Sequence, residues 1–400
     1  MSLADPIAET APETEADLAA LVADCAAAGR RIEIAGGETR AGIGRPVESD
    51  ISVSTAKLSD VALYEPAALT LVAGAGARLA DIEALLAAEG QRLPFEPMDH
   101  RRLLGTEGEP TLGGVVAGNV SGPRRIQAGA CRDSLIGVRF VDGRGRIIKN
   151  GGRVMKNVTG YDLVKLMAGS WGTLGVLTEI AFKLLPAPEA ARTLILDGLD
   201  DARAVDALSA ALGSPYDVTG AAHAPAGPDH DAATMIRLEG FAESVAYRAD
   251  RLAADLEPFG TARIEADAEA GAALWRAVRD VDAYAERPGA VWRCSVKPTD
   301  GPHLAARLHA ATAVTQARYD WGGGLVWILV PEEGDAGAAA IRAETAALGG
   351  HATLIRATAE TRRVVAPFHP EPAPLTRLSE SVRAKFDPAR ILNPGRMHPL

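Results

Sequence analysis

Hydrophobic residues near the start of the chain repeat with the period of a helix. Those between residues 18 and 25 fall on one face of a helix expected over 14–29. Thr14, followed by Asp17, has the pattern of a capping box, and Gly29 is a typical helix stop. The pattern predicts an amphipathic helix at the start of the fold.

Alternating hydrophobic and polar positions follow this helix and predict short strands. We expect strands at 31–35, 51–54, 69–73 and 176–186, and an amphipathic helix at 79–88. Residues 135–152 contain two alternating runs joined by a glycine-rich turn, which predicts a β-hairpin. Residues 111–122 (TLGGVVAGNVSG) are expected to form a long glycine-rich loop.

The composition changes after Pro188. Glycine becomes rarer, and alanine-rich helical windows occur at 200–212, 241–257, 267–285 and 302–316. Strands are predicted between them, at 235–239, 290–296 and 325–330. This alternation is typical of an antiparallel sheet with helices on one face, so we predict an α+β protein whose second domain begins at about residue 189.

Charge and cysteine content narrow the class of partner. The 400 residues carry a net charge of −10, which disfavours nucleic acid and anionic lipid as main partners. The three cysteines are far apart and have no iron–sulfur spacing, which fits a reducing compartment. We see no signal peptide and no apolar stretch of roughly 20 residues. We therefore expect a cytoplasmic protein, or one held at the inner membrane by partners.

Three glycine-rich segments indicate a site for a diphosphate. They are 34–40 (IAGGETR), 111–122 and 169–175 (GSWGTLG). Glycine lets several backbone N–H groups converge on phosphate oxygens, although such glycines can also serve only as turns. A P-loop pattern is absent, and Gly74-x-Gly76 lacks the third glycine of a Rossmann fingerprint. The basic residues that follow the second segment could balance phosphate charge: Arg124, Arg125 and Arg132.

These segments resemble a known family when they are taken in order with the end of the chain. Residues 31–40, 111–122, 160–185 and 386–396 look like the signature regions of the PCMH-type FAD-binding fold. Residues 122–133 and 151–162, with tryptophan and arginine motifs in the second domain, resemble the FAD-binding accessory subunit of bacterial glycolate oxidase.

The resemblance implies an architecture and partners. It implies a two-lobed FAD-binding domain (1–188, lobes about 1–90 and 91–188), an α+β cap domain (189–372), and a C-terminal segment (373–400) that returns to the FAD domain. It also implies a homologous catalytic flavin subunit and an iron–sulfur subunit. The complex would oxidise glycolate to glyoxylate and pass electrons to an acceptor other than oxygen.

The sequence departs from the family pattern in the loops. Glu38 replaces a glycine of the first loop, so it is expected to contribute only its backbone. Trp171 stands where an acid is common, and Gly324 begins a stretch that lacks a common Gln-Arg pair, which removes one cation. The first loop has no histidine, and Cys131 lacks the motif that tethers flavin. We therefore predict non-covalent FAD.

The resemblance also implies the residues of the site. The expected cofactor-binding residues are Ala35, Gly36, Gly37, Glu38, Thr39, Arg40, Pro97, Thr111, Gly113, Gly114, Ala117, Asn119, Ser121, Gly122, Arg132, Asp133, Gly172, Gly175, Val176 and Asn393. The catalytic residues stay unknown, with Arg279, Arg293 and Trp321 as candidates for a carboxylate clamp and a flavin wall. The same residues are also typical of ion pairs and packed cores. The eight histidines are scattered, so no metal site is predicted.

Three functions remain open from the sequence. The chain is an FAD-dependent subunit that helps to oxidise glycolate or a similar hydroxy acid. Alternatively, it is a structural or electron-relay subunit whose flavin never meets substrate. The third alternative is a self-sufficient oxidase or dehydrogenase of another hydroxy acid, such as D-lactate.

Overall fold

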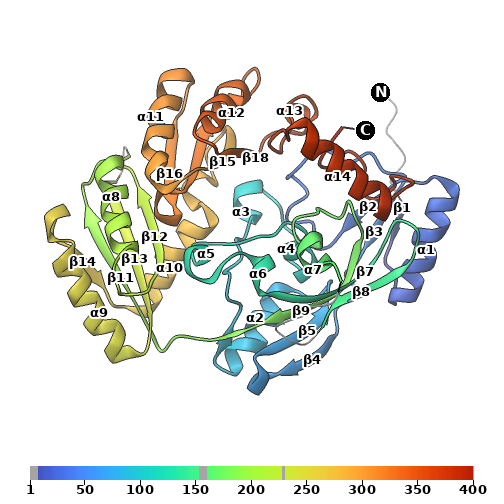
Figure 1. The fold of residues 1–400 in the computed structure, drawn as a ribbon, viewed down its shortest axis with the longest axis horizontal. Coiled ribbons are helices and arrows are strands. Elements are labelled where there is room, and N and C mark those ends of the chain that lie inside the picture. Colours follow the sequence, from blue (N-terminus) through green and yellow to red (C-terminus); the bar gives the residue numbers. More distant parts are fainter. Residues whose placement is uncertain (1–7, 153–159, 228–229, 400) are drawn as a thin grey trace.

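The computed structural model describes residues 8–152, 160–227 and 230–399. Within them, strands and helices form an α+β structure, as predicted (Figure 1). Its three larger sheets have three, five and eight strands. Residues 153–159, which carry part of the narrower family motif at 151–162, lie outside the described part of the chain. So do two residues, 228 and 229, of the loop between the strands β12 and β13 (bounds below).

A parallel three-stranded sheet begins the fold. Its order is β1 (Ala8–Thr10), β3 (Ile51–Ser54) and β2 (Ile32–Ala35), and α1 (Glu15–Ala28) connects β1 to β2. The predicted capping box is present, because Thr14 Oγ1 accepts the N–H of Asp17 at 3.1 Å and Asp17 accepts the N–H of Thr14. Gly29 ends α1 in a left-handed conformation. The first glycine segment starts where β2 stops.

An antiparallel five-stranded sheet forms the second part of the fold. Its order is β4 (Val61–Glu65), β5 (Thr70–Gly74), β9 (Val176–Lys183), β7 (Leu135–Val141) and β8 (Ile147–Gly151). The strands β7 and β8 are the predicted hairpin. The predicted helix at 79–88 is α2 (Leu79–Ala88). Smaller elements around this sheet are α3 (Arg101–Leu104), α5 (Arg125–Ala128), α6 (Cys131–Ser134), α7 (Leu163–Met167), and the paired strands β6 (Gln91–Arg92) and β10 (Leu185–Pro186).

The prediction of a continuous loop over 111–122 was wrong. Thr111 begins a helix, α4 (Leu112–Ala117), and its Oγ1 accepts the N–H of Gly114 at 3.3 Å. Val115 and Val116 are fully buried. Their burial stabilises the turn of helix that the low propensity of its glycines would disfavour. Tertiary packing thus determines the conformation of a segment whose glycine content had suggested an irregular loop.

An antiparallel eight-stranded sheet fills the second half of the chain. Its order is β14 (Arg263–Glu265), β11 (Ala190–Asp197), β13 (Ala233–Gly240), β12 (Val218–Ala224), β16 (Gln316–Asp320), β17 (Leu325–Val330), β15 (Ala290–Ser295) and β18 (His351–Arg356). The predicted strands at 235–239, 290–296 and 325–330 correspond to β13, β15 and β17.

Most helices of this half cover one face of the sheet. These are α8 (Asp201–Leu212), α9 (Ala242–Asp255), α11 (Gly301–Ala311) and α12 (Ala338–Ala347). The expectation of helices on one face only was wrong for α10 (Ala268–Asp280), because Trp275 packs with Ile195 and Met235 on the opposite face. Val291 on that opposite face packs into the hydrophobic core that also contains Leu71, Phe140 and Phe182 of the five-stranded sheet.

The end of the chain lies against the first part of the fold. After α13 (Ala359–Val364) and α14 (Ala373–Phe386), the Phe386 ring lies 6.0 Å from the Phe140 ring of β7. The buried Asp387 carboxylate accepts the N–H groups of Ile391 and Leu392. Leu392 then bridges Ile32 of β2, so the last residues sit beside the first glycine segment.

Candidate functional site

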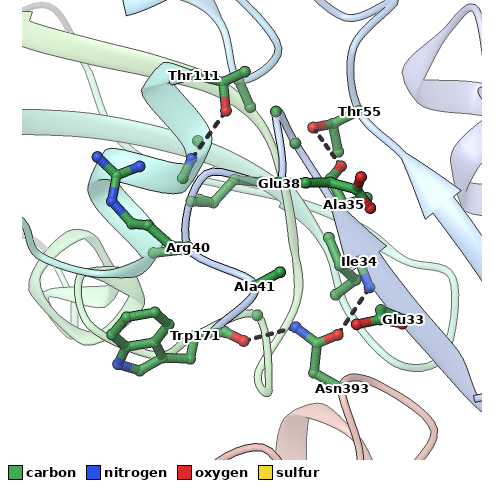
Figure 2. Close-up of a pocket in the computed structure, with 18 of the residues that line it drawn as sticks. Glu33, Ile34, Ala35, Glu38, Arg40, Ala41, Thr55, Thr111, Trp171 and Asn393 are labelled. Carbon is green, nitrogen blue, oxygen red and sulfur yellow. Dashed lines mark hydrogen bonds between the residues drawn. The ribbon is translucent and has the colours of Figure 1, made fainter. Parts of the chain in front are cut away.

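The glycine segments surround one cavity, which we call the loop cavity (Figure 2). It encloses about 890 Å³ of empty space between the end of β2, the start of α4, residues 170–175 and the C-terminal segment. Segments that are far apart in the sequence therefore meet at one site. The predicted cofactor-binding residues that line it are Ala35, Gly36, Gly37, Glu38, Thr39, Arg40, Thr111, Gly113, Gly114, Ala117, Gly172, Gly175 and Asn393.

Close backbone packing explains why glycine occupies the first loop. A Cβ atom on Gly37 would lie 1.5 Å from the carbonyl oxygen of Glu109, and one on Gly36 would lie 2.6 Å from Thr111 Oγ1. No L side chain fits at Gly37 without moving the loop. Glu38 adopts a left-handed φ of 56° and its side chain is exposed.

Several polar groups at the loop cavity have no hydrogen-bond partner among the described residues. Within the described residues, no acceptor meets the backbone N–H groups of residues 36–40. The Nε of Arg40 and the Oγ of Ser170 are also buried without a partner there. Burial lowers the pKa of Arg40 to about 10, so its guanidinium stays charged at neutral pH. Unpaired N–H groups beside a buried cation fit a diphosphate, as FAD requires.

The side chain of Asn393 holds two walls of the loop cavity together (Figure 2). Its Oδ1 accepts the N–H of Ile34 at 2.8 Å, and its Nδ2 donates to the carbonyl oxygen of Trp171 at 2.7 Å. Gly172 must be small here, since its Cβ would lie 2.6 Å from Asn393 Nδ2. Both ends of the amide are thus bonded to backbone groups, and these bonds help to fix the shape of the cavity.

The helix α4 leads from the loop cavity to a second one. Six helical residues span about 9 Å. Gly118, at the end of α4, lines the second cavity. We call it the interface cavity, because residues of the eight-stranded sheet also line it. It encloses about 520 Å³ of empty space, and Trp171 lines both cavities. Two cavities that meet along one helix suit an extended dinucleotide. Three more predicted cofactor residues line the interface cavity: Asn119, Ser121 and Gly122.

Two predicted cofactor-binding residues of the second glycine segment accept hydrogen bonds from backbone N–H groups of the protein. Asn119 Oδ1 accepts the N–H of Arg132 at 3.0 Å, and Ser121 Oγ accepts the N–H of Cys131 at 3.1 Å. These bonds shape the segment after α4. The remaining predicted cofactor residues line neither cavity: Pro97, Arg132, Asp133 and Val176.

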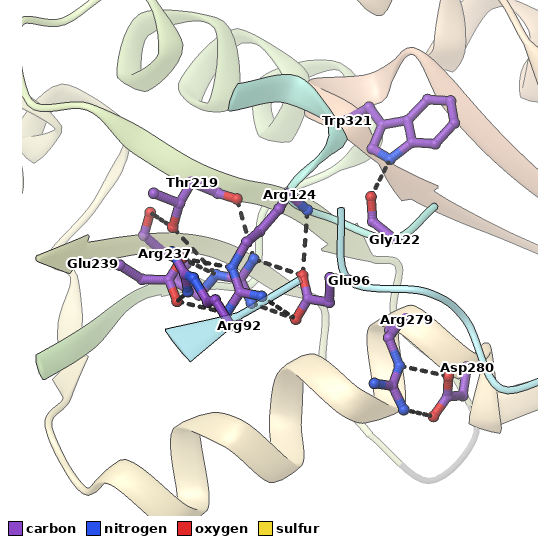
Figure 3. Close-up of polar contacts among 10 residues, drawn as sticks. All are labelled: Arg92, Glu96, Gly122, Arg124, Thr219, Arg237, Glu239, Arg279, Asp280 and Trp321. Carbon is purple, nitrogen blue, oxygen red and sulfur yellow. Dashed lines mark hydrogen bonds and ion pairs between the residues drawn. The ribbon is translucent and has the colours of Figure 1, made fainter. Parts of the chain in front are cut away.

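The candidate catalytic residues all line the interface cavity, but they differ in their partners. Arg279 makes two hydrogen bonds of 2.7 Å to the carboxylate of Asp280, so its charge is neutralised. Trp321 Nε1 donates to the carbonyl oxygen of Gly122 at 3.1 Å (Figure 3). Arg293 lies over the Trp321 ring, 5.2 Å from its centroid.

Two residues of the interface cavity were missed by sequence reasoning. His100 is 6% exposed, and its Nδ1 has no partner among the described residues. Burial, followed by the charge of Arg40, holds the pKa of His100 well below its usual value. Asp320 is 4% exposed, and burial raises its pKa to about 7. The sequence around each residue gave no signal, because the burial comes from distant elements.

A cluster of paired charges lies at the same domain interface (Figure 3). Arg124 makes a bidentate contact with Glu239, at 2.9 and 2.7 Å, and Arg92 also donates to Glu239. Arg237 makes a bidentate contact with Glu96, at 3.0 and 2.9 Å. The idea that Arg124 balances phosphate charge was therefore wrong, because the cap domain supplies its partner.

Three further observations concern Cys131, metal ligands and membrane-spanning helices. Cys131 is fully buried, burial raises the pKa of its thiol, and it lines neither cavity. In the described part of the chain, no group of three or more His, Cys, Asp or Glu side chains could hold a metal ion. The same residues contain no helix of the length and apolarity that a membrane crossing requires.

Comparison with known proteins identifies the class. A family model described as FAD binding domain matches residues 6–151. The fold is similar to that of p-cresol methylhydroxylase, with a TM-score of 0.70 and 16% identity over 98% of this chain and 88% of that one. Alkyldihydroxyacetonephosphate synthase gives a TM-score of 0.68 and 17% identity over 96% and 76%. Together with the loop cavity, these findings define a protein of the PCMH-type FAD-binding fold.

Sequence relatives identify the family within this class. The glycolate oxidase subunit GlcE of Escherichia coli is 33% identical over 366 residues, which cover 91% of this chain and 92% of that protein. The chain belongs to the GlcE family of glycolate oxidase subunits, which confirms the resemblance seen in its motifs.

More distant relatives share a smaller part of the chain. The glycolate oxidase subunit GlcD of Bacillus subtilis is 46% identical over 85 residues, or 21% of this chain and 18% of that protein. A D-lactate dehydrogenase of Anaerostipes hadrus is 31% identical over 175 residues, or 43% and 34%. The match to GlcE extends over nearly the whole chain, whereas these matches cover less than half of it.

Proposed function

We propose that the chain is an FAD-carrying subunit of a glycolate oxidase complex. In this complex, glycolate is oxidised to glyoxylate and the electrons pass to a partner iron–sulfur subunit. The similarity to GlcE supports the proposal, because it covers the cap domain as well as the FAD-binding domain. The match to GlcD supports a homologous flavin subunit as a second partner.

The loop cavity is the observation that carries the cofactor part of the proposal. We infer that the N–H groups of residues 36–40 and the guanidinium of Arg40 hold the FAD diphosphate. The segment from α4 to Gly122 then leads toward the interface cavity, which residues of the eight-stranded sheet also line. Bound FAD would supply the acceptor for the electrons that leave the alcohol carbon.

We also infer that the FAD is held without a covalent bond. Cys131 is buried away from both cavities, and residues 36–40 contain no histidine. Denaturing the purified chain should release all of the yellow chromophore into the supernatant. Flavin that stays with the precipitated protein would contradict this inference.

A variant of Gly37 tests the proposed cofactor site. Gly37→Ala places a Cβ 1.5 Å from the Glu109 carbonyl oxygen, so the loop must move and FAD content should fall at least tenfold. The matched control is Gly271→Ala, since its Cβ would meet no atom within 4 Å. FAD is measured by absorbance against protein concentration, and circular dichroism confirms folding. Full FAD content in a folded Gly37→Ala protein would contradict the proposed site.

An electron-relay role is a second candidate function. The bidentate pairing of Arg279 with Asp280 favours it, because this cation of the interface cavity is not free for a substrate. Anaerobic glycolate, added to the purified chain and to the purified complex, separates the two functions. Flavin bleaching in both supports direct oxidation by this chain, whereas bleaching only in the complex supports the relay. Bleaching of neither by glycolate would contradict the proposed function.

A further inference from the structure

Arg293 is a cation in the interface cavity that the protein leaves unpaired. It is half-buried on β15, and its strand neighbours Trp292 and Cys294 point into the helix-covered core. Within the described residues, the Arg293 side chain makes no ion pair and no hydrogen bond. Its contact there is the face of the Trp321 ring at 5.2 Å. A guanidinium has five donors, so this position offers an unused fork to a ligand.

The charges around Arg293 also favour the binding of an anion. Arg125 lies over the same Trp321 ring, 4.8 Å from its centroid. Burial, and then the nearby charge of Arg125, lower the pKa of Arg293 to about 10, so it remains a cation at neutral pH. The buried Asp320 is the acidic group that opposes this effect. A half-buried cation beside a second cation is unfavourable unless an anion binds between or beside them.

The backbone around Trp321 is held in an uncommon conformation that fixes the ring. Trp321 has a φ of 52°, and Gly322 and Gly323 follow with φ of 68° and 103°. Asp320 Oδ1 accepts the N–H of Trp321 at 2.7 Å, while the indole N–H reaches Gly122. Left-handed backbone at a bulky residue is often found at binding sites. Here it holds an aromatic platform against which Arg293 is oriented.

A neutral polar group lines the same cavity. His100 is buried and uncharged at neutral pH, and its Nδ1 has no partner among the described residues. An imidazole nitrogen of this kind can accept a hydroxyl proton or donate to a hydroxyl oxygen, depending on the tautomer. A free guanidinium and a neutral imidazole in one cavity match the two polar ends of a 2-hydroxy carboxylate.

We propose that this chain has its own substrate site, in which Arg293 binds the carboxylate of a short 2-hydroxy acid and His100 contacts the hydroxyl group. The proposal rests on the proposed function, and it sharpens that function by assigning a carboxylate site to this subunit. The interface cavity would have to hold both the ring-shaped end of the cofactor and the ligand, which favours a short acid. Arg125 supports the site by contributing positive potential and by packing on Trp321.

The test measures binding instead of turnover. Glycolate is titrated by calorimetry into the full-length chain that carries its FAD, under anaerobic conditions and at pH 7. Arg293→Gln should weaken glycolate binding at least tenfold, because a bidentate charge-assisted contact is lost. Arg293→Lys should restore part of the affinity. Arg276→Gln, at an exposed position of α10, is the matched control and should bind like the native chain.

A second comparison addresses His100. The native chain should bind glycolate more tightly than acetate, which lacks the hydroxyl group, and His100→Leu should bind both alike. FAD content and circular dichroism show whether each variant is folded. A native chain that binds no glycolate, or a folded Arg293→Gln chain with unchanged affinity, overturns the proposed site.

These outcomes are separate from those that test the proposed function. A complex that oxidises glycolate with an unchanged KM after Arg293→Gln overturns the carboxylate site and leaves the function intact. Conversely, a chain that binds glycolate through Arg293 in a complex that never oxidises glycolate supports the site and overturns the function.

Discussion

Two groups of arginines meet where the first part of the fold, which ends with β10, packs against the eight-stranded sheet. In the first group, Arg124 and Arg237 are satisfied by Glu239 and Glu96, and each of these pairs joins the two parts. Arg293 lies at the same interface without a carboxylate partner among the described residues. Both kinds of arginine are largely buried, yet only the first is neutralised within the protein.

The difference separates a structural role from a binding role. Charges that are paired across an interface fix the relative position of two domains, because removing either partner strands the other in a medium of low dielectric constant. An unpaired guanidinium contributes little to that geometry but keeps its donors for a ligand. Substitutions in the two groups should therefore change different measurements.

The largest effect is expected in the paired group. Glu239 is 8% exposed and accepts from Arg92 and Arg124, so Glu239→Gln leaves buried cations without their counter-charge. We expect unfolding free energy to fall by about 3 kcal/mol, as measured by denaturant titration. Glu243→Gln, at an exposed site on α9, is the control and should change stability by less than about 0.5 kcal/mol. Equal stabilities of the two variants would refute the structural role.

Arg124 and Arg125, which are adjacent in the sequence, allow the most direct comparison of a paired and an unpaired arginine. Arg124→Gln should lower the unfolding free energy by about 2 kcal/mol, because it breaks the bidentate contact with Glu239. Arg125→Gln should change it by no more than about 0.5 kcal/mol, because the Arg125 side chain has no ion pair in the described structure. The assay is the same denaturant titration. A larger loss for Arg125→Gln would reverse the interpretation.

Glycolate binding at the unpaired Arg293 should depend on pH, because Asp320 ionises nearby. Burial raises the pKa of Asp320 to about 7, with the N–H of Trp321 and the charges of Arg237 and Arg293 opposing the rise and Glu96 adding to it. As pH rises from 6 to 8, Asp320 ionises and offsets the charge of Arg293. Glycolate affinity should therefore fall about fivefold, close to 1 kcal/mol. Asp320→Asn should remove most of this pH dependence, and an unchanged slope would contradict the link.

The contribution of Asp320 to the free energy of unfolding should also fall as pH rises. Its pKa in the folded chain lies above the unfolded value of 3.8, so the folded state binds the extra proton between about pH 4 and 7. The contribution of this group to stability is thus complete at low pH and is lost as pH rises toward 7. Unfolding titrations of the native chain and Asp320→Asn across this range measure the difference.

The smallest effect is expected at the aromatic platform. Trp321→Phe removes the 3.1 Å bond from Nε1 to the Gly122 carbonyl oxygen but keeps an aromatic face under Arg293. Stability should fall by about 1 kcal/mol and glycolate affinity by about twofold. FAD content should stay constant. A loss of glycolate binding as large as that in Arg293→Gln would show that the ring itself holds the ligand.

Local sequence patterns were enough to predict much of the fold. The helix with its capping box at Thr14 and the hairpin of β7 and β8 depend on neighbours in the chain, and both were predicted correctly. The glycine segments also predicted the position of the loop cavity, because backbone segments that pack closely together require glycine, and glycine is visible in the sequence. The start of α4 was missed, since buried Val115 and Val116 stabilise it through tertiary contacts.

The charged part of the site was not accessible from local patterns. The partner of Arg124 is Glu239, which is 115 positions away, and the sequence offers no rule that joins them. Nothing near His100 or Asp320 in the sequence signals their burial. Arg279 and Arg293 were equivalent sequence candidates, and the contact between the Arg279 and Asp280 side chains separates them. Asp280 is the next residue in the sequence, but adjacency alone does not predict that two side chains turn toward each other.

The contacts of Asn393 have a consequence for the order in which the protein matures. This residue follows Ile34 by 359 positions, yet it joins Ile34 to Trp171 in the wall of the loop cavity. During synthesis, the first loop emerges long before the side chain that supports it leaves the ribosome. FAD capture should therefore wait until Asn393 has been made and has folded into place, and a product that stops before Asn393 should accumulate without flavin.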